Sequence, residues 1–149
     1  MPAIYLSLLV YRLSHEENEA FLARLNVPSK LAQVTRETLS LRDKSKDLEA
    51  SDLPRSQMYE WLRDCSPQAI RASIIASDSP LVRQRFRLFL SKLRRLRPSL
   101  NGDDLRSLGL PPGPQMGQIL KRLHAARLDG EVSTREEETA LVQKLLTSG

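Results

Sequence analysis

The chain has 149 residues, of which 40% are hydrophobic, 28% charged and 5% aromatic, the composition of a soluble globular protein with one domain or two small ones. A single cysteine, Cys65, excludes an internal disulfide framework and a cysteine-based zinc site. The scarcity of aromatic residues favours helices over a β-sandwich or barrel, and the formal net charge of +5 makes the location of the basic residues important.

The apolar segment at residues 3–11 is too short to span a bilayer, and Arg12 follows it directly. It also lacks the basic start and the small-residue cleavage site of a signal peptide. We therefore expect an intracellular, cytoplasmic protein that does not bind a membrane. Because the sequence opens on an apolar helix, we also expect further sequence upstream.

Local signals for helix starts recur along the chain. Residues 3–13 are predicted as an apolar helix, and Ser14 with Glu17 has the capping-box pattern of a second helix that ends near Leu25. The charged residues 42–52 are predicted as an exposed helix end and loop. Further helices are predicted where a proline fits the start of a helix, at Pro28, Pro54, Pro67, Pro80 and Pro114.

The composition changes after Pro98, because residues 99–118 contain four glycines and three prolines. We predict a short helix around Asp103–Leu108 between tight turns, and then a helix that begins at Pro114 and ends at Gly130. Ser133 or Thr134 caps the last helix.

No segment shows the sustained alternation of a strand. The fold class is therefore predicted as all-α, a bundle of about seven to nine short helices. Residues 1–98 form the predicted body and residues 99–149 the C-terminal part, and we expect the two to pack as one unit.

The basic character of the protein comes from one segment. Residues 81–97 contain no acidic residue, and without their seven basic residues the chain would have 16 basic against 18 acidic residues. The seven are Arg83, Arg85, Arg87, Lys92, Arg94, Arg95 and Arg97. Positive charge concentrated in this way is typical of a surface that binds a polyanion.

Drawn as a helix, this segment places its large apolar side chains on one face: Val82, Phe86, Phe89, Leu90, Leu93 and Leu96. Arg83, Arg87 and Arg94 follow one border of that face, and Arg85 and Lys92 follow the other. The guanidinium group suits bidentate phosphate contacts. We therefore predict nucleic-acid binding, with Arg83, Arg87 and Arg94 as the main phosphate contacts.

The basic segment also fits two roles that do not involve nucleic acid. Its cations can be neutralised within the protein by Asp43, Asp47 and Glu49, or the segment can dock an acidic protein partner. Seven positive residues without an intervening acid favour nucleic acid over both.

A second signal is the glycine- and proline-rich turn before the helix at Pro114. Gly113, Pro114 and Gly117 either expose a helix N-terminus to a phosphate or serve packing, and we expect Gly117 to allow a close approach of another segment. Three cations beyond this turn extend the predicted RNA-binding set: Lys121, Arg122 and Arg127.

No catalytic set can be assembled from the sequence. His15 and His124 are far apart, and Cys65 is predicted as a buried thiol. Asp103 and Asp104 are explained as negative charge at the start of a short helix rather than as metal ligands. We find no Ser/His/Asp set, no phosphate-binding loop and no zinc-ligand spacing, so catalytic and metal-binding residues are predicted to be absent from this chain.

Residues 100–130 carry a family resemblance, and they read LNGDDLRSLGLPPGPQMGQILKRLHAARLDG. This string resembles the C-terminal part of the bacterial class II tRNA nucleotidyltransferase/poly(A) polymerase family, in particular its A-adding, poly(A)-polymerase-like branch. The motif positions include Gly102, Asp104, Gly109, Gly113, Pro114 and Gly117, and the string ends with Leu128, Asp129 and Gly130.

The resemblance implies a helical, RNA-binding body and a tail without the catalytic nucleotidyltransferase head. The head of this family has an Asp-x-Asp pair that holds two metal ions, and this sequence has no Asp-x-Asp. Mg²⁺ and ATP or CTP are therefore expected only for a head domain that is absent from this chain. By itself, the chain is predicted to transfer no nucleotide.

For function, the resemblance implies that this region grips tRNA or structured RNA by backbone and shape while a head domain adds A or CCA to the 3′ end. Head and neck domains are then further partners, and a poly(A) activity of the intact protein stays open. The first alternative is a helical protein–protein adaptor whose basic helix docks an acidic partner. A complete small enzyme ranks last, because no catalytic set is visible.

Overall fold

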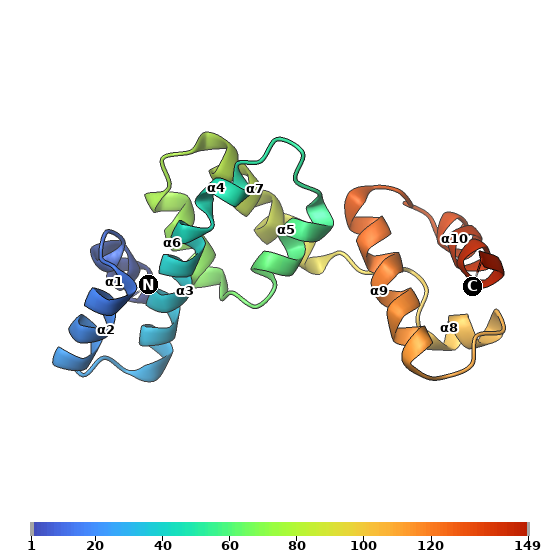
Figure 1. The fold of residues 1–149 in the computed structure, drawn as a ribbon, viewed down its shortest axis with the longest axis horizontal. Helices are drawn as coiled ribbons and strands as arrows, with labels where there is room; N and C mark the ends of the chain where they lie inside the picture. Colours follow the sequence, from blue (N-terminus) through green and yellow to red (C-terminus); the bar gives the residue numbers. More distant parts are fainter. Residues whose placement is uncertain (1, 149) are drawn as a thin grey trace. The chain divides into compact units, whose positions relative to one another are not determined.

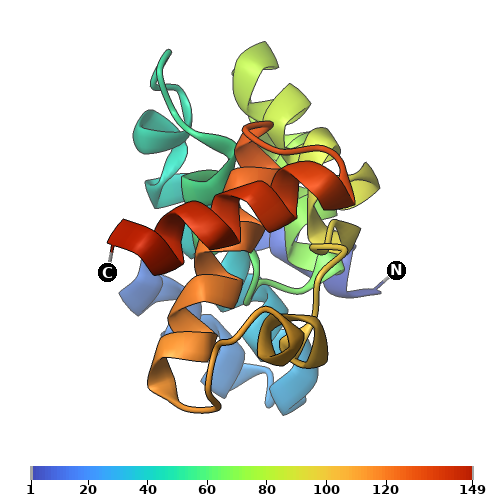
Figure 2. The same cartoon turned by 90° about the vertical axis from the view of Figure 1, so that its right-hand side faces the viewer.

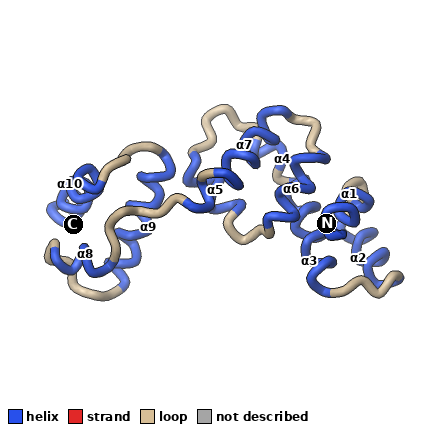
Figure 3. Tube along the Cα trace, turned by 180° about the vertical axis from the view of Figure 1, so that it is seen from behind, coloured by secondary structure: helices blue, strands red, loops and turns tan. Residues whose placement is uncertain are grey.

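The structure is a computed structural model that describes residues 2–148, and these residues form ten α-helices, one 3₁₀ helix and no strand (Figure 1 and Figure 3). The predicted all-α class is confirmed. The helices are α1 (Pro2–Val10), α2 (His15–Arg24), α3 (Ser29–Asp43), α4 (Ser45–Leu48), α5 (Arg55–Leu62), α6 (Pro67–Ala76), α7 (Pro80–Ser91), η1 (Leu93–Arg95), α8 (Gly102–Ser107), α9 (Pro114–Asp129) and α10 (Arg135–Ser148).

The number of helices exceeds the expected seven to nine partly because the charged segment after α3 does not unwind into a loop. The backbone continues in helical conformation at Lys44 and forms the single turn of α4. Leu48, the last residue of that turn, is completely buried. The burial of this one side chain anchors a segment whose other residues are so highly charged that the sequence predicted an exposed loop.

Helix starts follow the local signals in the sequence. The predicted capping box is confirmed, because the Ser14 hydroxyl accepts a hydrogen bond from the Glu17 N–H at 3.0 Å and the Glu17 carboxylate accepts one from the Ser14 N–H at 3.0 Å. Pro80 stands in the first turn of α7, whose N-cap Ser79 accepts from the Val82 N–H.

The chain divides into two compact units. The N-terminal unit comprises Met1–Leu53 and Met58–Arg94, and the C-terminal unit comprises Pro54–Gln57 and Arg95–Gly149. The main boundary between Arg94 and Arg95 lies close to the one placed after residue 98 from the sequence.

In the N-terminal unit, α3 and α6 pack against each other and α1 packs against both, as Figure 1 shows, while α7 packs on α6. The core includes Leu39, Met58, Leu62, Ile70 and Phe86, each at most 2% exposed. The centre of the Phe89 ring lies 6.0 Å from that of Tyr59, which is within the range of aromatic pairing.

In the C-terminal unit, α8 and α10 both pack on α9, and Figure 2 shows α10 crossing it. The core of this unit is aliphatic and comprises Leu100, Leu105, Leu110, Met116, Ile119, Leu123 and Val142. The Asp129 carboxylate, at the end of α9, accepts hydrogen bonds from the Ser56 N–H at 2.9 Å and the Ser56 hydroxyl at 2.7 Å, which ties residues 54–57 to this unit.

The C-terminal unit also contains a buried ion pair. The Glu138 carboxylate is completely buried and accepts hydrogen bonds from the backbone N–H groups of Ser99 at 3.0 Å and Leu100 at 3.1 Å. The Arg127 guanidinium donates to the same carboxylate at 3.0 Å. Glu138 therefore joins α10, α9 and the segment that precedes α8.

Among residues 2–148, no helix combines the length and the apolar character needed to cross a bilayer.

Candidate nucleic-acid interface

Helix α7 is anchored by its apolar face. Val82, Phe86 and Phe89 are buried, with at most 3% of each residue exposed, in the face predicted from the sequence. Because these residues recur at three- and four-residue intervals, the remaining face of α7 is left for the cations.

Within the N-terminal unit, three cations of this segment are free of internal partners. Within residues 2–148, the side chains of Arg83, Arg87 and Lys92 form neither a hydrogen bond nor an ion pair. Arg87 and Lys92 are exposed and Arg83 is half-buried. A guanidinium group without a protein partner keeps all its N–H donors for a ligand.

Arg85 differs from its neighbours. Its Nη1 donates a hydrogen bond to the backbone carbonyl of Leu48, the last residue of α4. The structure therefore uses this side chain, at least in part, inside the N-terminal unit.

The prediction of one continuous basic helix through Arg97 is wrong. α7 ends at Ser91, and Lys92 adopts φ −135° and ψ −58°, outside the helical region, before the 3₁₀ turn at Leu93–Arg95. The seven-residue spacing between Arg87 and Arg94 therefore does not place the two on one helical face. Apolar periodicity misled the prediction, because Leu93 is buried although the helix has ended.

The acidic residues proposed to neutralise the basic segment are engaged elsewhere or form no ion pair. Asp43 accepts hydrogen bonds from His15 Nε2 at 2.7 Å and Arg42 Nε at 3.1 Å. Burial raises the pKa of the Asp43 carboxyl, but the hydrogen bonds from His15 and Arg42 outweigh burial and leave that pKa below its usual value. Asp47 and Glu49 form no ion pair within residues 2–148.

The predicted cations of the C-terminal unit are more committed to internal contacts. Arg127 pairs with buried Glu138, and the Arg122 guanidinium lies 2.9 Å from the Glu131 carboxylate. Arg97 donates to the backbone carbonyl of Leu96 at 2.9 Å. Lys121 and Arg95 are exposed and form no such contact within the described residues.

The glycine- and proline-rich turn has a conformational rather than a packing role. Gly117 lies in α9, and apart from its chain neighbours and the adjacent backbone of its own helix no atom lies within 4 Å of the position that a Cβ would take, so the predicted close approach is wrong. Gly113, the N-cap of α9, has φ 152°, and Gly109 has φ 99°, both in the region that favours glycine. Pro114 begins α9 and Gly130 ends it with φ 80°, as predicted.

Asp104 has a capping role beyond the helix-start charge that its sequence position indicates. Its carboxylate accepts a hydrogen bond from the Asn101 N–H at 2.9 Å, and the Asn101 side chain accepts one from the Asp104 N–H at 3.0 Å, which is a capping box for α8. Arg135 of α10 also donates to Asp104, at 2.7 Å. The backbone hydrogen bond at Asn101 and then the Arg135 contact hold the pKa of Asp104 below its usual value.

Gly102 follows Asn101, and a Cβ there would meet the Met116 sulfur at 3.4 Å.

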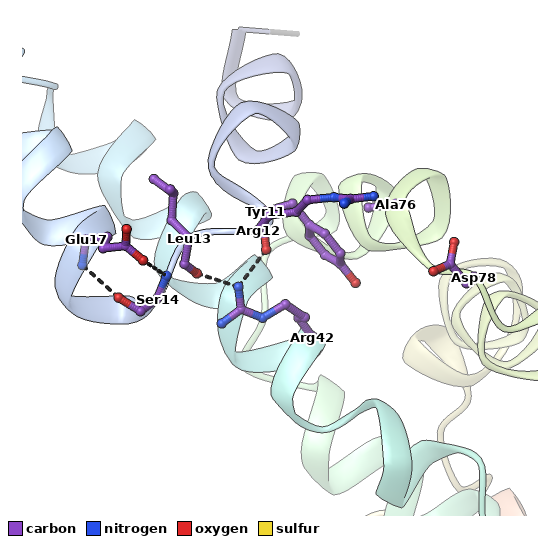
Figure 4. A pocket seen from close by; sticks show the side chains of 8 residues that line it. All are labelled: Tyr11, Arg12, Leu13, Ser14, Glu17, Arg42, Ala76 and Asp78. Carbon is purple, nitrogen blue, oxygen red and sulfur yellow. Dashed lines mark hydrogen bonds between the residues drawn. The ribbon is translucent and has the colours of Figure 1, made fainter.

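An open cleft of about 660 Å³ lies elsewhere in the N-terminal unit, near the junction of α1 and α2 (Figure 4). Arg42 donates to the backbone carbonyls of Tyr11 at 2.6 Å and Leu13 at 2.5 Å and so fixes this junction. The cleft is lined by Tyr11, Arg12, Leu13, Ser14, Glu17, Arg42, Ala76 and Asp78. None of the predicted RNA-binding residues lines it.

Among residues 2–148, no group of three or more His, Cys, Asp or Glu side chains is placed to hold a metal ion. Burial raises the pKa of the Cys65 thiol to about 11, with the charges of Glu37 and Asp64 contributing, and this disfavours the reactive thiolate.

Sequence reasoning missed the residues whose long-range contacts stabilise the inside of each unit, above all Arg42 in the N-terminal unit and Glu138 and Ser56 in the C-terminal unit. Their contacts join residues 29, 38 and 73 positions apart in the chain, so no local pattern marks them.

Comparison with known proteins finds similarity to tRNA nucleotidyltransferases. The chain is 29% identical to the A-adding tRNA nucleotidyltransferase of Deinococcus radiodurans over 151 residues, 89% of this chain and 34% of that protein. It is 38% identical to the A-adding tRNA nucleotidyltransferase of Geobacter sulfurreducens over 97 residues, 65% of this chain and 11% of that protein. The CC-adding tRNA nucleotidyltransferase of the same organism is 49% identical over 51 residues, 33% of this chain and 12% of that protein.

The chain thus spans about a third or less of the length of these relatives. The matches confirm the resemblance that residues 100–130 suggested, and they are consistent with a C-terminal region of such proteins. No family model matches the chain, and no solved structure matches it significantly.

Proposed function

We propose that this chain is the tRNA-binding C-terminal region of a tRNA nucleotidyltransferase-like protein of the cytoplasm. The chain binds the RNA through the phosphate backbone and the shape of the RNA. A separate head domain, with Mg²⁺ and ATP or CTP, adds nucleotides to the 3′ end. The observation that carries the proposal is the face of α7, where Arg83 and Arg87 lack internal partners in a chain similar to enzymes that act on tRNA.

Charge and geometry support a backbone contact. Arg83 and Arg87 are four residues apart on one helix, so their side chains lie on the same face, about one helical turn from each other. Phosphates are the sequence-independent targets of such a pair, and duplex RNA is read mainly through phosphate and 2′-hydroxyl contacts.

A matched pair of double variants tests the proposal. Arg83→Gln/Arg87→Gln removes two charges from α7, and Arg24→Gln/Lys30→Gln removes two exposed, unpartnered charges at the turn between α2 and α3. We expect the α7 variant to bind tRNA at least about tenfold more weakly, with the slope of log affinity against log salt smaller by nearly one unit for each lost phosphate contact. The control variant changes both much less.

Binding is measured at several salt concentrations, with circular dichroism to verify folding. Equal affinity and equal slope for wild type and the α7 variant would remove the RNA assignment from these residues and favour an acidic protein partner. Incubation of the purified wild-type chain with tRNA, ATP, CTP and Mg²⁺ completes the test, because nucleotide addition would contradict the assignment of the chemistry to another domain.

A further inference from the structure

Arg85 stands between Arg83 and Arg87 in the sequence but points to a different environment. At about 100° per residue, residues 83 and 87 lie within about 40° of each other around α7, whereas residue 85 lies about 160° from either. Its half-buried guanidinium reaches the carbonyl of Leu48, at the end of α4, which packs on α7.

The Leu48 carbonyl needs this donor. The last carbonyls of a helix have no partner within it, and α4 is a single turn. Backbone N–H groups donate to the carbonyls of Ser45, Lys46 and Asp47, whereas the contact at Leu48 comes from Arg85. Since Leu48 is completely buried, the contact fixes α7 to a part of the core that cannot shift easily.

We propose that Arg85 is a positioning residue for RNA binding, which fixes the rotation of α7 so that Arg83 and Arg87 face outward together. This inference rests on the proposed function, because it assigns Arg85 to the geometry of the interface rather than to the phosphate contacts. A cation that contacts phosphate and one that positions such cations differ in their salt dependence, since only the first releases counterions from the RNA.

The test compares the tRNA affinities of Arg85→Met, Arg85→Lys and Arg83→Gln at several salt concentrations. Binding is measured at a temperature far below the melting temperature of the least stable variant. We expect Arg85→Met to weaken binding about tenfold at every salt concentration and to keep the wild-type slope. Arg85→Lys, which retains a donor for one carbonyl, restores most of the affinity. Arg83→Gln lowers the slope by nearly one unit. If Arg85→Met does not fold, Arg85→Gln decides the question: it removes the charge but keeps an N–H donor, so a positioning role predicts near-wild-type affinity and slope, whereas a phosphate contact predicts a lower slope.

Two results overturn the positioning role. A slope lowered as much by Arg85→Met as by Arg83→Gln would make Arg85 a phosphate contact. A lower melting temperature with wild-type affinity and slope would limit Arg85 to local stability. The proposed function fails separately, if the wild type does not bind tRNA or if Arg83→Gln and Arg87→Gln change neither affinity nor slope, and Arg85 then has no interface to position.

Discussion

Replacing Arg127 by methionine should severely destabilise the C-terminal unit. The substitution keeps the apolar stem but removes the charge 3.0 Å from Glu138, a carboxylate with no solvent-exposed surface. Two neutral backbone donors, at Ser99 and Leu100, then remain to balance a buried negative charge.

The expected cost follows from measurements on comparable pairs. Removing one partner of a buried ion pair costs about 3–5 kcal/mol. Folded domains are stable by roughly 0.05–0.15 kcal/mol per residue, or about 3–9 kcal/mol for a unit of about 60 residues. Arg127→Met alone is therefore expected to remove a large part of the stability of this unit.

Urea unfolding followed by far-ultraviolet circular dichroism measures the loss. Trp61, the single tryptophan, belongs to the N-terminal unit, so its fluorescence reports that unit and should shift less. The double variant Arg127→Met/Glu138→Leu removes both charges and should regain more than half of the lost stability, because an apolar replacement of a whole buried pair is often nearly neutral. A single variant within about 1 kcal/mol of wild type, or a double variant less stable than the single, would refute the argument.

Two further predictions concern the start of the C-terminal unit. Gly117→Ala should stabilise the protein by about 0.5–1 kcal/mol, because the site is helical and open, whereas Gly113→Ala, at φ 152°, should destabilise it, and thermal unfolding of the two variants would show opposite shifts. Because Asp104 has a lowered pKa in the folded protein, its contribution to stability is present above the ordinary value of 3.8 and is lost as the pH falls through the lower folded value. In acid unfolding experiments, the free energy of unfolding of Asp104→Asn should therefore depend less on pH below about 4 than that of wild type. Parallel curves of this free energy against pH for the two proteins would contradict the prediction.

The features that could be predicted from the sequence are those encoded locally. The capping box at Ser14, the proline at the start of α7 and the glycine that ends α9 each act within a few residues, so the sequence pattern contains the physical cause. The buried face of α7 was also predictable, because Val82, Phe86 and Phe89 repeat with the helical period.

The partners of the cations could not be predicted in the same way. Arg87 and Arg127 are both arginines on helices, yet Arg87 has no partner within the described residues and Arg127 is paired with a buried carboxylate. That difference arises from the packing of α10 on α9, and no local pattern contains it. The end of α7 escaped prediction for a related reason, because buried Leu93 continues the apolar pattern after the helix has stopped.

The contact between Ser56 and Asp129 has a consequence for biosynthesis. The two residues are 73 positions apart, and Ser56 is synthesised first. At about 5–20 residues per second, the segment around Ser56 waits roughly 4–15 s for the carboxylate that holds it. Residues 54–57 therefore join the C-terminal unit only after α9 has left the ribosome, so this unit completes its fold late in translation. A shortened chain that begins at Arg95 would lack the segment of polypeptide to which Asp129 binds.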